Sequence, residues 1–233
     1  MSLIYYLLIS IVGVTLLSLI GTKTIKKYSK FYYVAIGLLA FLTTIFEIFK
    51  LHSNYKLPIF LYGLERSTMK GYIAMGFFIL VMFAGAMNTK WTITRKLLSI
   101  RGEMAILGSI LIIPHGIMYL VRFIIKLFNG KEPTALNIIY LILGIVGFLI
   151  MIPLFITSFK SIRKKINHVK WKSIQRWSYL FFGLVYVHIL IVLLSSKNVD
   201  WPRISIYTLI FITYTALKIN KANVMEKKKI LNT

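Results

Sequence analysis

Long apolar runs separated by short basic linkers recur along this 233-residue chain, and they constrain its fold more than any other feature. Several runs approach or exceed the ~20 residues that a helix needs to cross the ~30 Å hydrocarbon core of a bilayer. Hydrophobic residues make up 58% of the sequence, more than the interior of a soluble domain requires. The alternating pattern of membrane β-strands does not occur. The sequence therefore predicts an all-α, multi-pass protein of the cytoplasmic membrane.

The distribution of basic residues predicts how the chain crosses the membrane. The first, third and fifth linkers hold four, four and seven Lys or Arg residues and the C-terminal tail holds five, which together are 20 of the 29 in the chain. The positive-inside rule then places the N-terminus outside and the C-terminus in the cytoplasm. We expect seven spans at Leu3–Ile20, Tyr32–Phe49, Met69–Met87, Arg101–Lys126, Leu136–Thr157, Ile174–Leu194 and Arg203–Leu217.

The ends of the chain are expected to differ from its centre. The first run has no positive residue before it and a basic cluster after it, whereas a secretory signal carries its charge first. We therefore interpret residues 1–31 as a retained additional span with its basic linker. Residues 32–218 form the expected helical core, and residues 219–233 a basic cytoplasmic tail.

Charge and cysteine content exclude several classes of function. The formal net charge of +23 lies in linkers between apolar runs, so anionic lipid headgroups are better partners for it than nucleic acid. The absence of cysteine excludes thiolate-bound iron–sulfur clusters and covalent haem attachment. A GxGxxG or P-loop pattern after a strand is also absent. We therefore expect any redox cofactor to be held without covalent attachment or by histidine.

Two histidines within long apolar runs are the candidate metal ligands. His115 lies twelve residues after Glu103 and His188 twelve residues after Arg176, so both are ~18 Å from the inner boundary of their spans. Two helices that carry single histidines at one depth suit axial ligation of a porphyrin from both sides. A histidine in a span can also simply hydrogen-bond a carbonyl group of a neighbouring helix. The residues alone leave both interpretations of the pair open.

Neighbours of His115 on the same helical face fit a haem site. Gly108 lies seven residues before it, while Tyr119 and Arg122 lie four and seven residues after it. Gly108 and Gly116 could make room for a flat ring. Arg122 is placed to pair with the propionate groups of a haem.

Three motifs resemble one membrane family. They are RGEMAILGSILIIPH at residues 101–115, LFITS at 154–158 and WKSIQRWSYLFFGLVYVH at 171–188. They are similar to the ferric-reductase-like transmembrane family, and within it to the haem-binding membrane subunits of methionine sulfoxide reductase systems (MsrQ, YedZ). The shared features are an Arg fourteen residues before a His, a Thr-Ser pair that ends the next helix, and a Trp-led helix with a central His. The resemblance covers about residues 65–218.

The resemblance implies a six-helix haem domain with one span added before it. It implies one haem b held by His115 and His188, with Gly108, Tyr119 and Arg122 around it and no catalytic residue on the chain. Electrons would pass from a quinol or a cytoplasmic flavin donor to an extracytoplasmic protein or metal ion. The family usually carries a further His at the position of Gln175, and this departure puts a second haem in doubt.

Other groups are assigned lesser roles or none. The basic linkers could receive an FMN phosphate or an acidic flavoprotein, or they could only set topology and touch lipid. Glu47 is expected to pair with Lys50 or to face the interface, and His52 and His168 are expected to be solvated loop residues. The alternative function, from another class, is a haem-free membrane transporter or scaffold whose histidines only pack.

Overall fold

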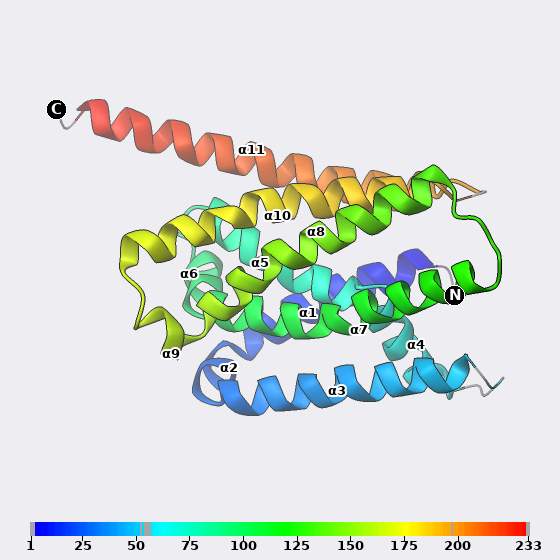
Figure 1. Ribbon diagram of the computed structural model, residues 1–233. Coiled ribbons are helices and arrows are strands. Elements are labelled where there is room, and N and C mark those ends of the chain that lie inside the picture. Colours follow the sequence, from blue (N-terminus) through cyan, green and yellow to red (C-terminus); the bar gives the residue numbers. More distant parts are fainter. Residues whose placement is uncertain (1–2, 52, 54–56, 197, 232–233) are drawn as a thin grey trace.

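The computed structural model describes residues 3–51, 53, 57–196 and 198–231, and within these ranges the regular secondary structure is entirely helical. Long helices lie side by side as a bundle (Figure 1). The helices are α1 (Leu3–Ile20), α2 (Thr22–Lys27), α3 (Ser29–Lys50), α4 (Ile59–Met69), α5 (Tyr72–Ala86), α6 (Thr92–Ser99), α7 (Arg101–Phe128), α8 (Ala135–Ser158), α9 (Lys160–Arg163), α10 (His168–Leu194) and α11 (Trp201–Leu231).

The lengths and hydropathies of these helices are those of a multi-pass membrane protein. In lipid a segment must satisfy its own backbone N–H and C=O groups, and a helix does so within itself. Among the described residues, α1, α3, α7, α8 and α10 are each long and apolar enough to span a bilayer, and α4 with α5 makes a sixth candidate if the bent pair is one span.

The expected seventh span is not confirmed. Residues Arg203–Leu217 lie within α11, which continues as one helix to Leu231 and is not among the candidate spans. Ser, Thr and Tyr residues interrupt the apolar part of α11, and Arg203 and Lys218 flank it. These polar residues lower its mean hydropathy below that of the other long helices.

The two ends of the bundle differ in composition. The short helices α2, α6 and α9 and the C-terminal part of α11 gather at one end, on the left of Figure 1, together with the basic linkers that contain them. We call this the basic end. The opposite end carries the start of α1 and the C-terminal ends of α3, α7 and α10. Which side of a membrane each end faces stays a prediction.

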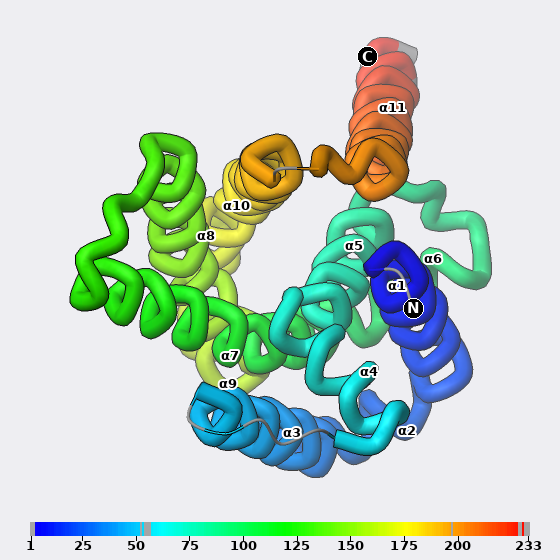
Figure 2. Tube along the Cα trace, turned by 90° about the vertical axis from the view of Figure 1, so that its right-hand side faces the viewer, coloured from blue at the N-terminus to red at the C-terminus, as the bar shows by residue number. Residues whose placement is uncertain are grey.

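Helix α5 forms the buried centre of the bundle. Eleven of its 15 residues are buried, and it is apolar on all sides, as a fully enclosed helix must be. It packs against α1, α7 and α11, while α7 also contacts α3 and α8, and α8 lies along α10. Figure 2 shows α3 at the edge of the bundle, where α7 is its main neighbour.

A sharp bend replaces the expected start of the third span. The third span was expected to begin at Met69, but the linker before it contains most of α4, and α5 follows at an angle of 56°. Gly71 forms the bend with φ = +71°, a backbone conformation that only glycine adopts without strain. The apolar run Ile59–Tyr62 directly after Pro58 is the sequence signal for α4.

Single-cysteine labelling of this cysteine-free chain decides how many times it crosses the membrane. If α11 spans, Lys131→Cys and Asn198→Cys react with an impermeant maleimide added outside. Lys96→Cys, Lys165→Cys and Glu226→Cys then react only after the membrane is opened. Labelling of the residue 226 and residue 198 variants from the same side would show that α11 does not cross.

Candidate functional site

The structure brings His115 and His188 together in the interior of the bundle. His115 lies in α7 and His188 in α10, and their ring centroids are 6.4 Å apart with an angle of 79° between the ring planes. The two residues are 73 positions apart in sequence, so they meet only because α7 and α10 both pack against α8. Their proximity agrees with the equal depth predicted from the sequence.

Each imidazole is held by one main-chain carbonyl group. Nδ1 of His115 lies 2.9 Å from the carbonyl oxygen of Met69, and Nδ1 of His188 lies 2.8 Å from that of Tyr140. A carbonyl oxygen can only accept a hydrogen bond, so each Nδ1 carries the proton and donates it. In the neutral ring Nε2 then keeps its lone pair. Within the described part of the chain, neither Nε2 has a hydrogen-bond partner.

The carbonyl group of Met69 is free for His115 because the helix breaks there. The last carbonyl groups of a helix have no intrahelical donor. Lys70 N donates to Arg66 O and Gly71 N to Thr68 O, which leaves Met69 O to the imidazole. The bend at Gly71 therefore positions a ligand-orienting acceptor, and the left-handed glycine is its cause.

The second carbonyl group lies within a regular helix and is reached across a glycine. Tyr140 O belongs to the interior of α8, so His188 uses the second lone pair of an oxygen already inside the helix. Gly144 is one turn further along α8. A Cβ atom there would lie 3.5 Å from Cε1 of His188, so any longer side chain would displace the ring. Gly71 and Gly144 were not singled out from the sequence. Gly71 directly precedes the apolar run of α5, and Gly144 lies within the apolar run of α8.

This arrangement is compatible with a pair of metal ligands. Ligating histidines typically donate the second ring N–H to a carbonyl or carboxylate, which fixes the tautomer and the ring orientation. Two imidazoles on opposite sides of one metal ion have ring centres about 6 Å apart, because each metal–nitrogen bond is ~2 Å. The observed 6.4 Å is close to this value.

The number of donors favours a porphyrin over a bare metal ion. No group of three or more His, Cys, Asp or Glu side chains that could hold a metal occurs among the described residues. Two imidazoles are too few for a structural or catalytic zinc site. They suffice for an iron ion whose other four ligands come from a porphyrin.

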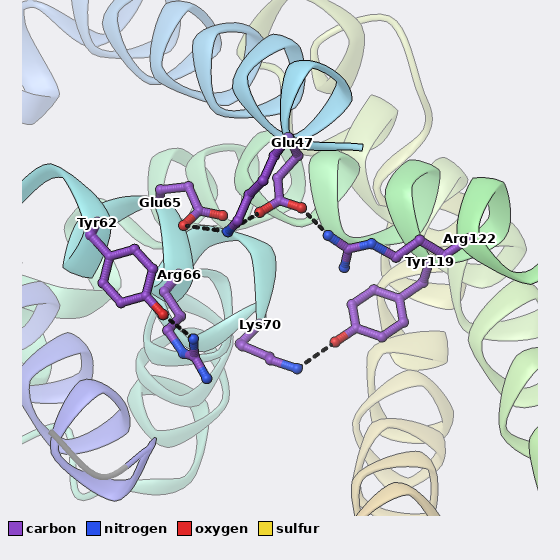
Figure 3. Close-up of polar contacts among 8 residues, drawn as sticks. Glu47, Tyr62, Glu65, Arg66, Lys70, Tyr119 and Arg122 are labelled. Atoms are coloured by element: carbon purple, nitrogen blue, oxygen red, sulfur yellow. Dashed lines mark hydrogen bonds and ion pairs between the residues drawn. The ribbon is translucent and has the colours of Figure 1, made fainter. Parts of the chain in front are cut away.

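A cluster of charged residues lies beside the histidine pair, at the end of the bundle opposite the basic end. Figure 3 shows its members, among them Glu47, Tyr119 and Arg122. Tyr119 connects the cluster to the histidine pair, because its ring lies 4.6 Å from the ring of His115 and its hydroxyl accepts a hydrogen bond from Lys70 Nζ at 2.8 Å. Arg122 also lies over the Tyr119 ring and donates to the carboxylate of Glu47. The structure thus places Tyr119 and Arg122 next to His115 and gives Arg122 an acidic partner that we had not assigned.

The predicted glycines lie elsewhere. A Cβ atom at Gly108 would lie 3.0 Å from Cε1 of Phe78 and 3.1 Å from Cβ of Phe77, and one at Gly116 would clash with the ring of Phe148. Gly108 therefore allows α7 to approach α5, and Gly116 allows it to approach α8. A role of Gly108 in binding a flat ring stays a prediction that these contacts do not support.

Towards the basic end, the position of Gln175 borders a small cavity. The cavity has a volume of ≈ 40 Å³ and lies between α5, α7, α8 and α10, with Arg101, Ser109 and Gln175 among its lining residues. Gln175 Nε2 donates to Thr157 Oγ1 at 2.9 Å, and Arg101 Nε donates to Val81 O at 3.0 Å. A space of this size holds only ~3 water molecules. The residues and the volume do not fit a second porphyrin here.

The remaining histidines stay outside the site. His168 was expected in a loop, but it is the first residue of α10, where it is exposed and its ring centroid lies 6.0 Å from that of Trp171. Asn167 caps the N-terminus of α10, because its side chain accepts a hydrogen bond from Val169 N. His52 lies outside the described residues.

Comparison with known proteins assigns the family. Residues 70–194 match the family described as "Ferric reductase like transmembrane component", which covers more than half of the chain. The chain belongs to this family of membrane proteins, whose name suggests a role in electron transfer. An uncharacterized protein of Treponema pallidum (strain Nichols) is 29% identical over 224 residues, which cover 92% of this chain and 60% of that protein. The chain therefore spans about 60% of the length of this relative. No solved structure gives a significant match.

Replacing Gly71 tests whether the bend holds His115. Gly71→Ala forces alanine into the left-handed region, which costs about 1–3 kcal/mol, and its Cβ would meet Ile112 Cδ1 at 2.8 Å. We expect a lower midpoint of thermal unfolding in detergent. Gly183→Ala in α10 is the control, since nothing lies within 4 Å of its Cβ position and its midpoint should not fall. Equal midpoints for both variants would contradict a positioning role of the bend.

Proposed function

We propose that this protein is a b-type haem protein that transfers single electrons through the membrane, with His115 and His188 as the axial ligands of one haem. Membership of the ferric-reductase-like family supports a membrane electron-transfer role. The observation that carries the proposal is the pair of carbonyl-bound imidazoles, 6.4 Å apart, whose Nε2 atoms are both unprotonated and without a protein partner.

The alternative interpretation of each histidine explains less. A histidine that only packs needs one hydrogen bond to a neighbouring carbonyl group, and both residues have it. Each ring also keeps an Nε2 lone pair, and the described residues supply a hydrogen-bond donor to neither. A metal ion between the two rings satisfies both at once.

When bound, a b-type haem takes up and releases one electron at its iron. The residues of this chain bind and orient it. His115 and His188 would each bind its iron through Nε2, and the carbonyl groups of Met69 and Tyr140 hold the rings in the tautomer that this binding requires. Tyr119 covers the edge of the His115 ring. Arg122 is the proposed partner of the propionate groups, with donors left over from its bond to Glu47.

The charge of the surrounding cluster fits a dianionic group. Its six charged residues are two acidic and four basic, namely Glu47, Glu65, Lys50, Arg66, Lys70 and Arg122, so two positive charges are not balanced by the protein. The Nε atom of Arg66 is buried and has no hydrogen-bond partner. Uncompensated charge in a partly buried place is costly. The two carboxylates of one haem would balance it.

We propose that the donor side is the basic end. Towards this end, the cavity at Gln175 does not fit a second porphyrin that could relay electrons to the histidine pair. A membrane quinol or a flavin held near the basic end is therefore the proposed donor. The linkers around α6 and α9 carry the positive charge that an FMN phosphate or an acidic flavoprotein would recognise. The acceptor is an extracytoplasmic protein or metal ion, as the likeness to MsrQ subunits suggests.

The competing function, a haem-free transporter or scaffold, has one structural feature in its favour. The α4–α5 pair is an interrupted span, and interrupted spans form substrate sites in many transporters. Those folds carry such interruptions in corresponding positions of two halves. Within the described residues one such pair occurs.

Substitution of the ligands tests the proposal. After purification in mild detergent with haemin available during expression, the wild-type protein should show a sharp reduced α band and one haem per chain by pyridine haemochrome assay. His115→Ala and His188→Ala should each lose nearly all bound haem, because one axial ligand and one orienting contact disappear together.

Gln175→Ala is the matched control, since Gln175 lies on the same helix as His188 but has a protein partner for its amide. It should keep one haem per chain. Full haem content in either histidine variant would contradict the ligand assignment, and a colourless wild-type protein would favour the haem-free alternative.

A further inference from the structure

Glu47 is a buried acid at the end of the bundle opposite the basic end. Its side chain is 3% exposed, although it belongs to α3, the helix at the edge of the bundle. One carboxylate oxygen accepts from Arg122 Nη2, and the other lies 3.2 Å from Lys50 Nζ. A buried carboxylate is retained where it is paired, and breaking such a pair leaves a charge without compensation. Glu47 therefore ties α3 to α7 at Arg122.

A continuous series of contacts leads from Glu47 to the histidine pair. Figure 3 shows the Glu47 carboxylate pointing towards the Arg122 guanidinium, with Tyr119 beside it. The guanidinium carbon of Arg122 lies 5.8 Å from the centre of the Tyr119 ring, and that ring lies 4.6 Å from the ring of His115. Glu47 does not contact the histidines itself, so any effect on them acts through Arg122 and through its electric field.

The acids of this cluster come from outside the family match. The matched segment begins at residue 70, so it includes Tyr119 and Arg122 but neither Glu47 nor Glu65. Met69, whose carbonyl group orients His115, also precedes it. The N-terminal 69 residues thus supply both an orienting contact and the negative charges beside the shared site.

The sign of the effect follows from elementary electrostatics. Reduction adds one negative charge at the iron, so nearby positive charge favours the reduced state and nearby negative charge the oxidised state. The field of a buried carboxylate is poorly screened by salt, in contrast to that of an exposed one. Removing the charge of Glu47 exposes the site to the full charge of Arg122 and Lys50.

We propose that Glu47 is a positioning residue through which the N-terminal segment lowers the reduction potential of the site, by holding Arg122 against Tyr119 and neutralising its charge. This inference rests on the proposed haem. It assigns to α3 a redox-tuning role, with Arg122 as the residue through which it acts.

Spectroelectrochemical titration of the reduced α band tests the inference with the full-length protein. Glu47→Gln should shift the midpoint potential upwards. Arg122→Gln should shift it downwards, and the double variant, which has the wild-type net charge, should return most of the way to the wild-type value. Glu132→Gln removes the same charge from the exposed loop after α7 and should leave the potential unchanged.

If the Glu47 or Arg122 variant does not fold, a substitution of Lys50 provides a second test. The Lys50 side chain is 38% exposed, so Lys50→Gln should be tolerated, and by removing a positive charge beside Glu47 it should lower the potential. Unchanged potentials in the Glu47, Arg122 and Lys50 variants, with haem still bound, would overturn the inference and leave the proposed function intact. A wild-type protein without haem would overturn both.

Discussion

The hydrogen bond from an imidazole to a main-chain carbonyl group is the interaction on which the proposed site depends. In an apolar interior each backbone polar group must find a partner, so a carbonyl group can accept from an imidazole either where a helix ends or bends or through its second lone pair. The bend at Gly71 provides one for His115, and the missing side chain at Gly144 gives His188 access to the other. These two bonds fix which nitrogen of each ring carries its proton and thereby make the pair suitable for a metal.

The structure divides the chain into a shared part and an additional part. The family match covers α5 to α10, including both histidines, Tyr119 and Arg122. The preceding segment contributes α1, which packs against the central helix α5, and α3, which is tied to α7 by Glu47. Much of the surroundings of His115 therefore comes from outside the matched segment.

The sequence predicts the parts of the fold that depend on local pattern. The limits of α1, α7 and α8 follow from apolar runs and flanking charges, and the approach of His115 to His188 follows from equal depth along two helices. Helix α4 and the bend after it could not be placed from the sequence. The apolar run after Pro58 is too short to be a span, and it does not indicate in which direction the chain continues. The Glu47–Arg122 pair joins residues 75 positions apart, and only the packing of α3 on α7 brings them together. The seventh span is not confirmed, because polar residues lower the mean hydropathy of α11 below that of the other long helices.

The proposed function depends on two imidazoles, one from α7 and one from α10, that bind a single iron. The electron paramagnetic resonance spectrum of the oxidised, purified protein tests it most directly. The ring planes of His115 and His188 meet at 79°, and nearly perpendicular axial imidazoles give a highly anisotropic low-spin ferric signal. The account predicts such a signal at one spin per chain, lost in His115→Ala and His188→Ala. A high-spin ferric signal from the wild-type protein, or a low-spin signal that survives either substitution, would contradict it.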